Sequence, residues 1–321
     1  MAIHDPSEFG IVYGSQNKVL AFHTDMDKPV LLTERIDKEE RGGGHVTSLA
    51  FDKSKKELYD AAGYEGVVRN TLTGEKVYSF NPEKNCAIHS LCFYNGNLVA
   101  LQQIGNYVAS LVDTQSGSNI AIITADREKG LKFRPSSLSM AITNRGRIYV
   151  SSENIIEVIP QEKGQTKVKR LTDYLSDFTR LITNGKDVYC VYNYHDPEGA
   201  QVRRVPSHKK VAFWKPSIDN KDPSNNKVYG FPDISAIIGD TLVVGTTIYK
   251  STTTMYKHPD HSLYLIQLTQ KMLEARKGAR ATPQLLLKEA FEDAHVYGVG
   301  NPMIIIPRKD LENIISIVVN R

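Results

Sequence analysis

The side chains best suited to chemistry gather in two short segments, residues 192–201 and 249–262. The histidines and carboxylates there are His195, Asp196, Glu198, His258, Asp260 and His261. Imidazole nitrogens and carboxylate oxygens are common ligands of divalent metals. The spacing His258-Pro-Asp-His261 matches no closed metal motif, however, and surface loops collect such residues by chance. We therefore expect no metal and no cofactor, and we interpret both segments as loops that face a partner.

Tyrosines accompany these polar groups and support the same interpretation. A tyrosine ring offers a flat amphipathic surface, which is enriched in protein interfaces. The candidate partner-binding residues are Tyr194, His195, Asp196, Tyr249, Tyr256, His258 and His261. We predict that they bind a protein or a peptide.

Familiar catalytic signatures do not occur in the sequence. It contains no GxSxG elbow, P-loop, HExxH motif or GxGxxG fingerprint after a strand. The three glycines of residues 42–44 precede a strand and do not open a helix, so we expect no phosphate site there. The sequence favours a non-catalytic protein.

Short β-rich segments separated by turns recur along the chain and must position these loops. Residues 45–80 read HVTSLAFD, KELYDAAGYEG, VVRN and GEKVYSF, and residues 88–123 repeat this order. Four short strands in a period of about 45 residues are typical of a β-propeller blade. We predict an all-β fold, a β-propeller of four-stranded antiparallel blades that forms one domain over residues 1–321.

The number of blades depends on how the chain ends are assigned. We expect further blades in residues 136–171, 178–215 and 234–291, with an incomplete blade that ends near residue 36. A last blade would hold VYGVGN, MIIIPR and NIISIVV as three strands. Seven blades are the first prediction. Six are the alternative, in which N-terminal and C-terminal strands share one blade, and pairing of the two ends closes the ring in either case.

The clearest repeat resembles a WD40 repeat. A Gly-His pair ending at His45 precedes its first strand, and Glu65-Gly66 forms a tight turn between its second and third strands. The resemblance implies a WD40-like propeller in which His45, Glu65 and Gly66 hold a blade together. His89 and His295 would have the same structural role in their own blades. No Trp-Asp dipeptide ends a third strand, so the resemblance concerns architecture and not a particular function.

Three long insertions interrupt the repeat at residues 192–201, 215–233 and 249–262. Equivalent loops of neighbouring blades emerge on the same face of a propeller. The three insertions are therefore expected to converge on one side of the ring, where loops on a rigid scaffold usually carry function.

Positive charge is concentrated in residues 269–281, TQKMLEARKGARA, for which we predict one short helix. Such a helix could contact an acidic partner or an RNA backbone. The whole chain is only mildly basic, with a net charge of +4 and a pI near 8.7, which is less than a dedicated nucleic-acid-binding protein carries.

Cysteine content and hydropathy indicate the compartment. Three cysteines with no CxxC pair argue against a disulfide framework or a structural zinc site. The first residues lack a basic segment followed by an apolar one, and no run of 18 apolar residues occurs. We expect a cytoplasmic protein without membrane contact.

These observations favour a non-catalytic interaction scaffold that binds a protein or peptide through the long-loop face. One alternative is a metal-dependent propeller hydrolase similar to lactonases, which would need acidic and amide ligands on the inner strands. Another is an RNA-associated scaffold, suggested by the basic segment. Nucleic acid is thus a second possible partner.

Overall fold

The computed structural model describes most of the chain. The described residues are 5–15, 17–35, 45–62, 66–80, 86–105, 108–125, 138–152, 154–161, 166–172, 179–193, 200–214, 228–250, 262–287, 290 and 302–321. Within these ranges, no helix is both long enough and apolar enough to cross a membrane.

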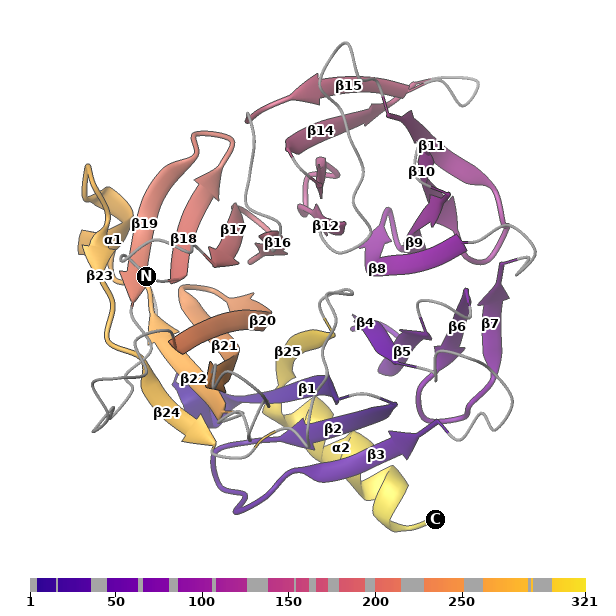
Figure 1. Ribbon diagram of the computed structural model, residues 1–321. Helices are drawn as coiled ribbons and strands as arrows, with labels where there is room; N and C mark the ends of the chain where they lie inside the picture. Colours follow the sequence, from indigo (N-terminus) through magenta and orange to yellow (C-terminus); the bar gives the residue numbers. More distant parts are fainter. Residues whose placement is uncertain are drawn as a thin grey trace.

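Antiparallel sheets stand side by side around a central axis and form a propeller (Figure 1). Blade 2 consists of β4 (Val46–Asp52), β5 (Glu57–Ala62), β6 (Val67–Asn70) and β7 (Lys76–Ser79). Blade 3 consists of β8 (Cys86–Tyr94), β9 (Asn97–Ile104), β10 (Val108–Asp113) and β11 (Asn119–Thr124). Blade 4 consists of β12 (Ser139–Ile142), β13 (Ile148–Ser151), β14 (Ile155–Pro160) and β15 (Thr166–Arg170). The predicted four-stranded blades are confirmed.

The next two blades carry the long insertions. Blade 5 consists of β16 (Thr179–Thr183), β17 (Val188–Asn193), β18 (Ala200–Val205) and β19 (Lys209–Trp214). Blade 6 consists of β20 (Val228–Ile238), β21 (Thr241–Lys250), β22 (Ser262–Gln267) and β24 (Gln284–Leu287). In blades 2 to 6 the first strand is the innermost one.

Both ends of the chain build blade 1. A short 3₁₀ turn (Pro6–Glu8) leads into β1 (Phe9–Ser15), β2 (Lys18–Phe22) and β3 (Val30–Glu34), and β25 (Met303–Pro307) is the inner strand. The register of β25 on β1 runs from Phe9 opposite Pro307 to Tyr13 opposite Met303. The described strands therefore form six blades, the alternative in which the two termini share a blade, and the first prediction of seven is wrong.

The residues expected to form the last strand form a helix instead. The helix α2 spans Arg308–Val319 and includes NIISIVV. Leu311 and Ile314 are buried, and Ile315 and Val318 pack against the same cluster between blades 1 and 2. Their spacing of i, i+3, i+4 and i+7 is helical, and this periodicity outweighs the β propensity of isoleucine and valine.

The expected helix at residues 269–281 is shorter than predicted. The helix α1 covers only Gln270–Glu274, with Thr269 as its N-cap, and β23 (Ala279–Arg280) follows. Gly278 adopts a positive φ of 73°, which a helix interior does not allow. The strand β23 then pairs in parallel with β19 of the neighbouring blade, and this pairing ends the helix early.

The hydrophobic core is divided into layers, each lying between two consecutive blades. One cluster joins blades 5 and 6 around Trp214, and another joins blades 6 and 1 around Tyr13 and Phe22. Similar clusters fill the four other seams. A blade buries both faces of its sheet only when another blade packs on each side. Closing the ring supplies the last of these contacts and therefore contributes to the free energy of folding.

Serines on the inner strands connect blades by hydrogen bonds. The Ser48 hydroxyl accepts from the backbone N–H of Leu91 at 2.9 Å, and the Ser139 hydroxyl accepts from the N–H of Leu181 at 3.1 Å. Ser90 donates to the carbonyl of Met140 at 3.5 Å. A serine is small enough for the crowded centre, and it satisfies backbone groups that no strand pairs there.

Candidate functional site

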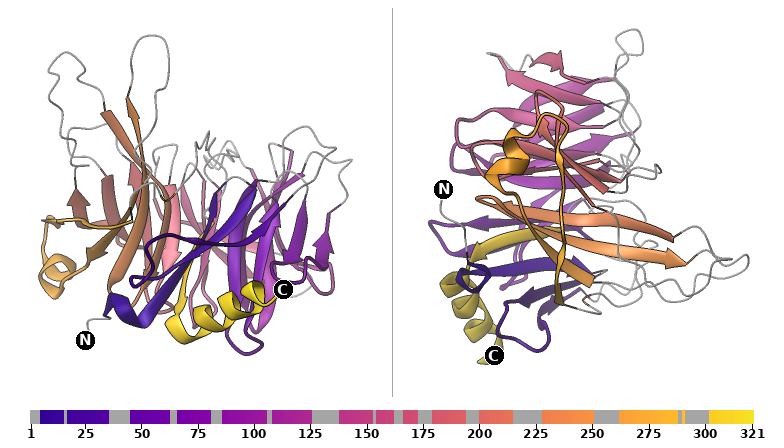
Figure 2. Two further views of the ribbon diagram at one scale, coloured as in Figure 1. Left: turned by 90° about the horizontal axis from the view of Figure 1, so that it is seen from below. Right: turned by 90° about the vertical axis from the view of Figure 1, so that its left-hand side faces the viewer.

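The strands β20 and β21 of blade 6 are the longest of the described strands and reach beyond the ring on one side (Figure 2). Their pairing extends from Ile238 opposite Thr241 to Val228 opposite Lys250. We expected residues 228–233 to be part of a loop, and this is wrong. The segments VYGF and TTIYK are both rich in β-formers, and pairing with each other supplies the backbone hydrogen bonds that neither would find alone.

The outer half of this hairpin is a two-stranded ribbon. The strand β22 pairs with β21 only from Thr241 to Thr246. Beyond Thr246, β21 continues to Lys250 and pairs with β20 alone among the described strands. The edges of such a ribbon offer backbone N–H and C=O groups to an added strand.

Tyr249 is the one predicted partner-binding residue whose backbone the structure describes. It lies near the end of the ribbon, and its Cα partner on β20 is Tyr229. The other predicted residues lie outside the described ranges: Tyr194, His195, Asp196, Tyr256, His258 and His261. Tyr229 was missed from the sequence because its segment looked like a loop, and only the pairing places it opposite Tyr249.

The strand ends that flank the long insertions lie at the same end of blade 5. Asn193 is opposite Ala200, and Ala200 is opposite Trp214. Ala200 and Trp214 are both buried in the cluster between blades 5 and 6. The only tryptophan of the chain therefore anchors the base of this face, which we call the ribbon face: the ends of β17, β18 and β19 together with β20 and β21.

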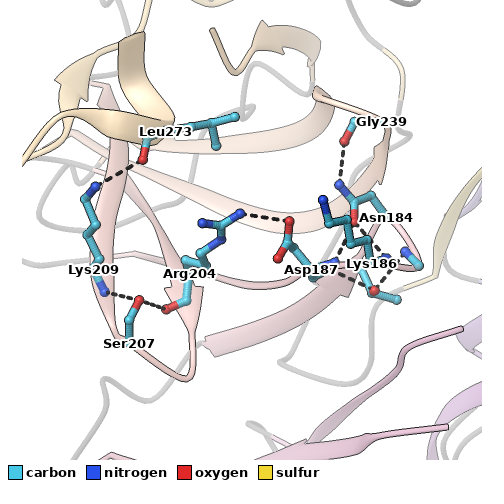
Figure 3. A network of polar contacts seen from close by, with 10 residues as sticks. Asn184, Lys186, Asp187, Arg204, Ser207, Lys209, Gly239 and Leu273 are labelled. Carbon is cyan, nitrogen blue, oxygen red and sulfur yellow. Dashed lines mark hydrogen bonds and ion pairs between the residues drawn. The ribbon is translucent and has the colours of Figure 1, made fainter. Parts of the chain in front are cut away.

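A polar network on the opposite side fixes blade 5 to blade 6 (Figure 3). The Asn184 side chain donates to the carbonyl of Gly239 at 2.9 Å and accepts from the N–H of Asp187 at 2.8 Å. The Asp187 carboxylate in turn pairs with Arg204 at 2.8 Å. These bonds hold the turn between β16 and β17 against the turn between β20 and β21, so the ribbon face rests on a rigid base.

A polar cavity of about 160 Å³ lies between blades 1 and 2. It is lined by Thr33, Glu34, Arg35, Asp60, Arg69, Asn70, Thr71 and Gly74. Arg35 and Asp60 form an ion pair whose side chains are 3% and 2% exposed. Such burial costs solvation energy that the pair must offset, and we assign the pair to the blade interface.

Three of the five predicted structural residues, His45, Gly66 and His89, lie in the described part of the chain. His45 is exposed directly before β4, and Gly66 has a positive φ of 63° with the Phe80 β-carbon close by. His89 lies inside β8, not before it, at an irregularity of the β8–β9 pairing. Glu65 and His295 lie outside the described residues. A structural role for these five residues stays a prediction.

His89 is completely buried. Burial, and after it the charge of Arg180, lower the pKa of His89 to about 4, and Gln103 opposes this shift only in part. A neutral imidazole in the protein interior is a packing group at neutral pH.

The two cysteines with described side chains are not poised for nucleophilic chemistry. Cys92 and Cys190 are both free thiols. Burial raises the pKa of each thiol to about 12, so neither forms a thiolate near neutral pH. In the described part of the chain, no three His, Cys, Asp or Glu side chains are arranged to hold a metal ion.

Comparison with solved structures supports the fold. A protein of unknown function from Bacteroides caccae is 14% identical over 94% of this chain and 99% of its own, with a TM-score of 0.53. U3-55K is 9% identical over 95% of this chain and 97% of its own, with a TM-score of 0.51. The RRP9 WD40 repeats are 9% identical over 89% of this chain and 82% of their own, with a TM-score of 0.49.

These likenesses concern the fold alone, because the sequence identities are low. No protein-family model matches the sequence. No curated protein matches it either. The chain is therefore similar in overall fold to the Bacteroides caccae protein and to U3-55K.

Proposed function

We propose that this chain is a WD40-like, single-domain scaffold that binds a protein or peptide through the ribbon face and has no catalytic role. The observation that supports this most is the hairpin of β20 and β21, which extends beyond the strand that pairs with it. The backbone edges of a projecting ribbon suit an extended peptide, and tyrosine is a residue type enriched in protein interfaces.

The alternative of a metal-dependent hydrolase has less support. Such an enzyme would need several acidic side chains on the inner strands. Among the residues of the six inner strands, only Asp52 and Asp233 are acidic. Asp52 accepts from the backbone N–H groups of Ser54 and Lys55 and so stabilises a turn.

The partner is expected in a reducing compartment. Cys92 and Cys190 are free, as suits the cytoplasm. We keep the cytoplasm as the proposed location.

Removal of residues 252–261, with a short Gly-Ser linker in their place, tests the function. The segment connects β21 to β22, and connecting segments tolerate change, so circular dichroism and the melting temperature should stay unchanged. Partner recovery in a tagged pull-down from the source lysate, after nuclease treatment, should fall at least tenfold. The exposed double variant Asp27→Ala and Lys28→Ala, in blade 1, is the matched control.

A second variant, Tyr249→Ala with Tyr229→Ala, tests the ribbon separately. It should weaken the same partner without changing the melting temperature by more than a few degrees. If both variants recover the partner as well as the control does, the ribbon face is not the binding surface.

A further inference from the structure

A segment of blade 6 crosses to the outer edge of blade 5. Residues 268–281, which we call the strap, leave β22, form α1 and β23, and return to β24 (Figure 1). Ala279 and Arg280 of β23 lie opposite Ala212 and Phe213 of β19. The backbone N–H of Ala281 donates to the carbonyl of Phe213 at 2.8 Å. The strap thus covers the open edge of β19 and adds a fifth strand to that sheet.

A lysine of β19 holds the helix of the strap in place. Lys209 donates to the backbone carbonyl of Leu273 at 3.1 Å (Figure 3). It also donates to the carbonyl of Glu274 at 3.0 Å. These carbonyls end α1, where a cation is favourable. Lys210, the next residue, stacks on the ring of Phe213 at 5.2 Å. The strap and β19 therefore form one surface, which we call the basic edge.

The basic edge carries more positive charge than the whole protein has in net terms. Its cations are Lys209, Lys210, Lys271, Arg276, Lys277 and Arg280, and its one carboxylate is Glu274. Six cations and one carboxylate leave a net charge of +5, compared with +4 for the complete chain. The rest of the chain therefore has a net charge of −1.

Four of the six cations form no ion pair within the described part of the molecule. Lys271, Arg276, Lys277 and Arg280 are exposed, and none of them forms an ion pair with a described residue. Glu274 bonds to Gln270 through its carboxylate. Like charges that lie together repel one another, and an anionic partner would relieve this repulsion.

The chemistry of the edge favours a nucleic acid over an acidic protein. A protein interface normally has an apolar centre. Leu273 is buried and Met272 packs against the cluster between blades 5 and 6, so both apolar side chains of α1 turn inward. A phosphate backbone, in contrast, is bound by exposed lysines and arginines with counterion release.

We infer that the basic edge binds the phosphate backbone of a nucleic acid. This inference is independent of the proposed function, because the basic edge and the ribbon face use different residues. Contacts to phosphates carry no base information. Single-stranded RNA and DNA of the same length should therefore bind within about tenfold of each other, and a preference for RNA would indicate additional contacts to the 2′-hydroxyl.

Fluorescence anisotropy with a labelled 20-nucleotide RNA, repeated with DNA, tests the inference. Phosphate contacts from the four exposed cations Lys271, Arg276, Lys277 and Arg280 predict a slope of about −3 in log affinity against log salt, at about −0.7 per contact. A fourfold rise in salt should then weaken binding about 50-fold. The variant with all four residues changed to Gln loses these contacts, so its affinity should be lower and should depend much less on salt.

The control variant changes four exposed lysines of blades 1 and 2, Lys28, Lys53, Lys55 and Lys76, to Gln. It alters the net charge equally and should keep the wild-type salt slope, and melting curves confirm that both variants are folded. Equal loss of affinity in both variants would overturn the inference, as would absence of binding at 50 mM salt. Tighter binding of a poly-glutamate peptide than of RNA would also overturn it, in favour of an acidic protein.

Discussion

The side chain of Leu311, in the helix α2, occupies the space that a β-carbon would fill at Gly10 of β1. These residues lie near the two ends of the chain. Leu311 is completely buried, and Gly10 pairs with Ile306 of β25. The C-terminal helix therefore packs directly on the N-terminal strand, and the closure of the ring depends on the absence of a side chain at Gly10.

Replacement of Gly10 by Ala should destabilise the protein by about 1–3 kcal/mol, because the added methyl group overpacks the contact with Leu311. Leu311→Ala should cost about 2–5 kcal/mol through the cavity that it leaves. In the double variant each change offsets part of the other, so the cost should be smaller than the sum. Urea unfolding of the four proteins measures this cycle, and simple additivity would show that the two residues do not meet.

The ion pair between Arg35 and Asp60 gives a second prediction. Asp60→Ala leaves a buried guanidinium without its carboxylate and should destabilise the protein by about 3–5 kcal/mol. Replacement of both residues, Arg35→Met with Asp60→Leu, should recover much of the loss, because apolar groups of similar size avoid the desolvation cost. Thermal unfolding compares the variants. A double variant less stable than Asp60→Ala would mean that the pair contributes net stability.

The inner-strand serines give a third prediction, which is a ranking. Ser48→Ala and Ser139→Ala each leave a buried backbone N–H without an acceptor and should cost about 1–3 kcal/mol. Ser90→Ala should destabilise the protein less, since the Ser90 bond to the Met140 carbonyl is longer, at 3.5 Å. A buried carbonyl that loses a donor also costs less than a buried N–H that loses its acceptor. Chemical denaturation measures the stability of all three variants. A larger loss of stability in Ser90→Ala than in the other two would contradict this ranking.

His89 gives a prediction about pH. Its pKa is about 4 in the folded protein and near 6.5 when the chain is unfolded, so between these values the unfolded state binds more protons. Stability should therefore fall as the pH falls from about 6.5 to about 4, by up to about 3 kcal/mol from this residue.

The variant His89→Gln removes this titration. Its free energy of unfolding should depend less on pH in the same window, whereas both proteins should behave alike between pH 7 and 8. His208, whose pKa is also lowered by burial, remains in both proteins and contributes the same trend. An unchanged pH dependence in the variant would show that His89 is accessible to protons in the folded state.

Much of the fold could be predicted because its information is local. The strand from Val46 to Asp52 and the strand from Cys86 to Tyr94 begin the two clearest repeats, and turns with glycines at positive φ separate the strands that follow, as at Gly74 and Gly117. Such patterns depend on neighbours in the sequence. The propeller class and the strand order in blades 2 to 6 followed from them.

The candidate site could be predicted only in part. Tyr249 was found because it stands in an insertion rich in tyrosine and histidine. Tyr229 was not, since nothing near it in the sequence shows that residues 228–232 pair with residues 246–250. A hairpin of this length is decided by mutual pairing, which is not visible in either segment alone.

By itself, the sequence determined that the chain forms four-stranded blades, that long insertions interrupt blades 5 and 6, and that positive charge concentrates after β22. Only the tertiary structure decided that β25 completes the blade begun by β1, that NIISIVV is a helix, and that the strap crosses to β19. Each of these depends on partners far apart in the chain. The free energy of burial and strand pairing between such partners outweighs local propensity, and a sequence pattern read over a few residues does not contain it.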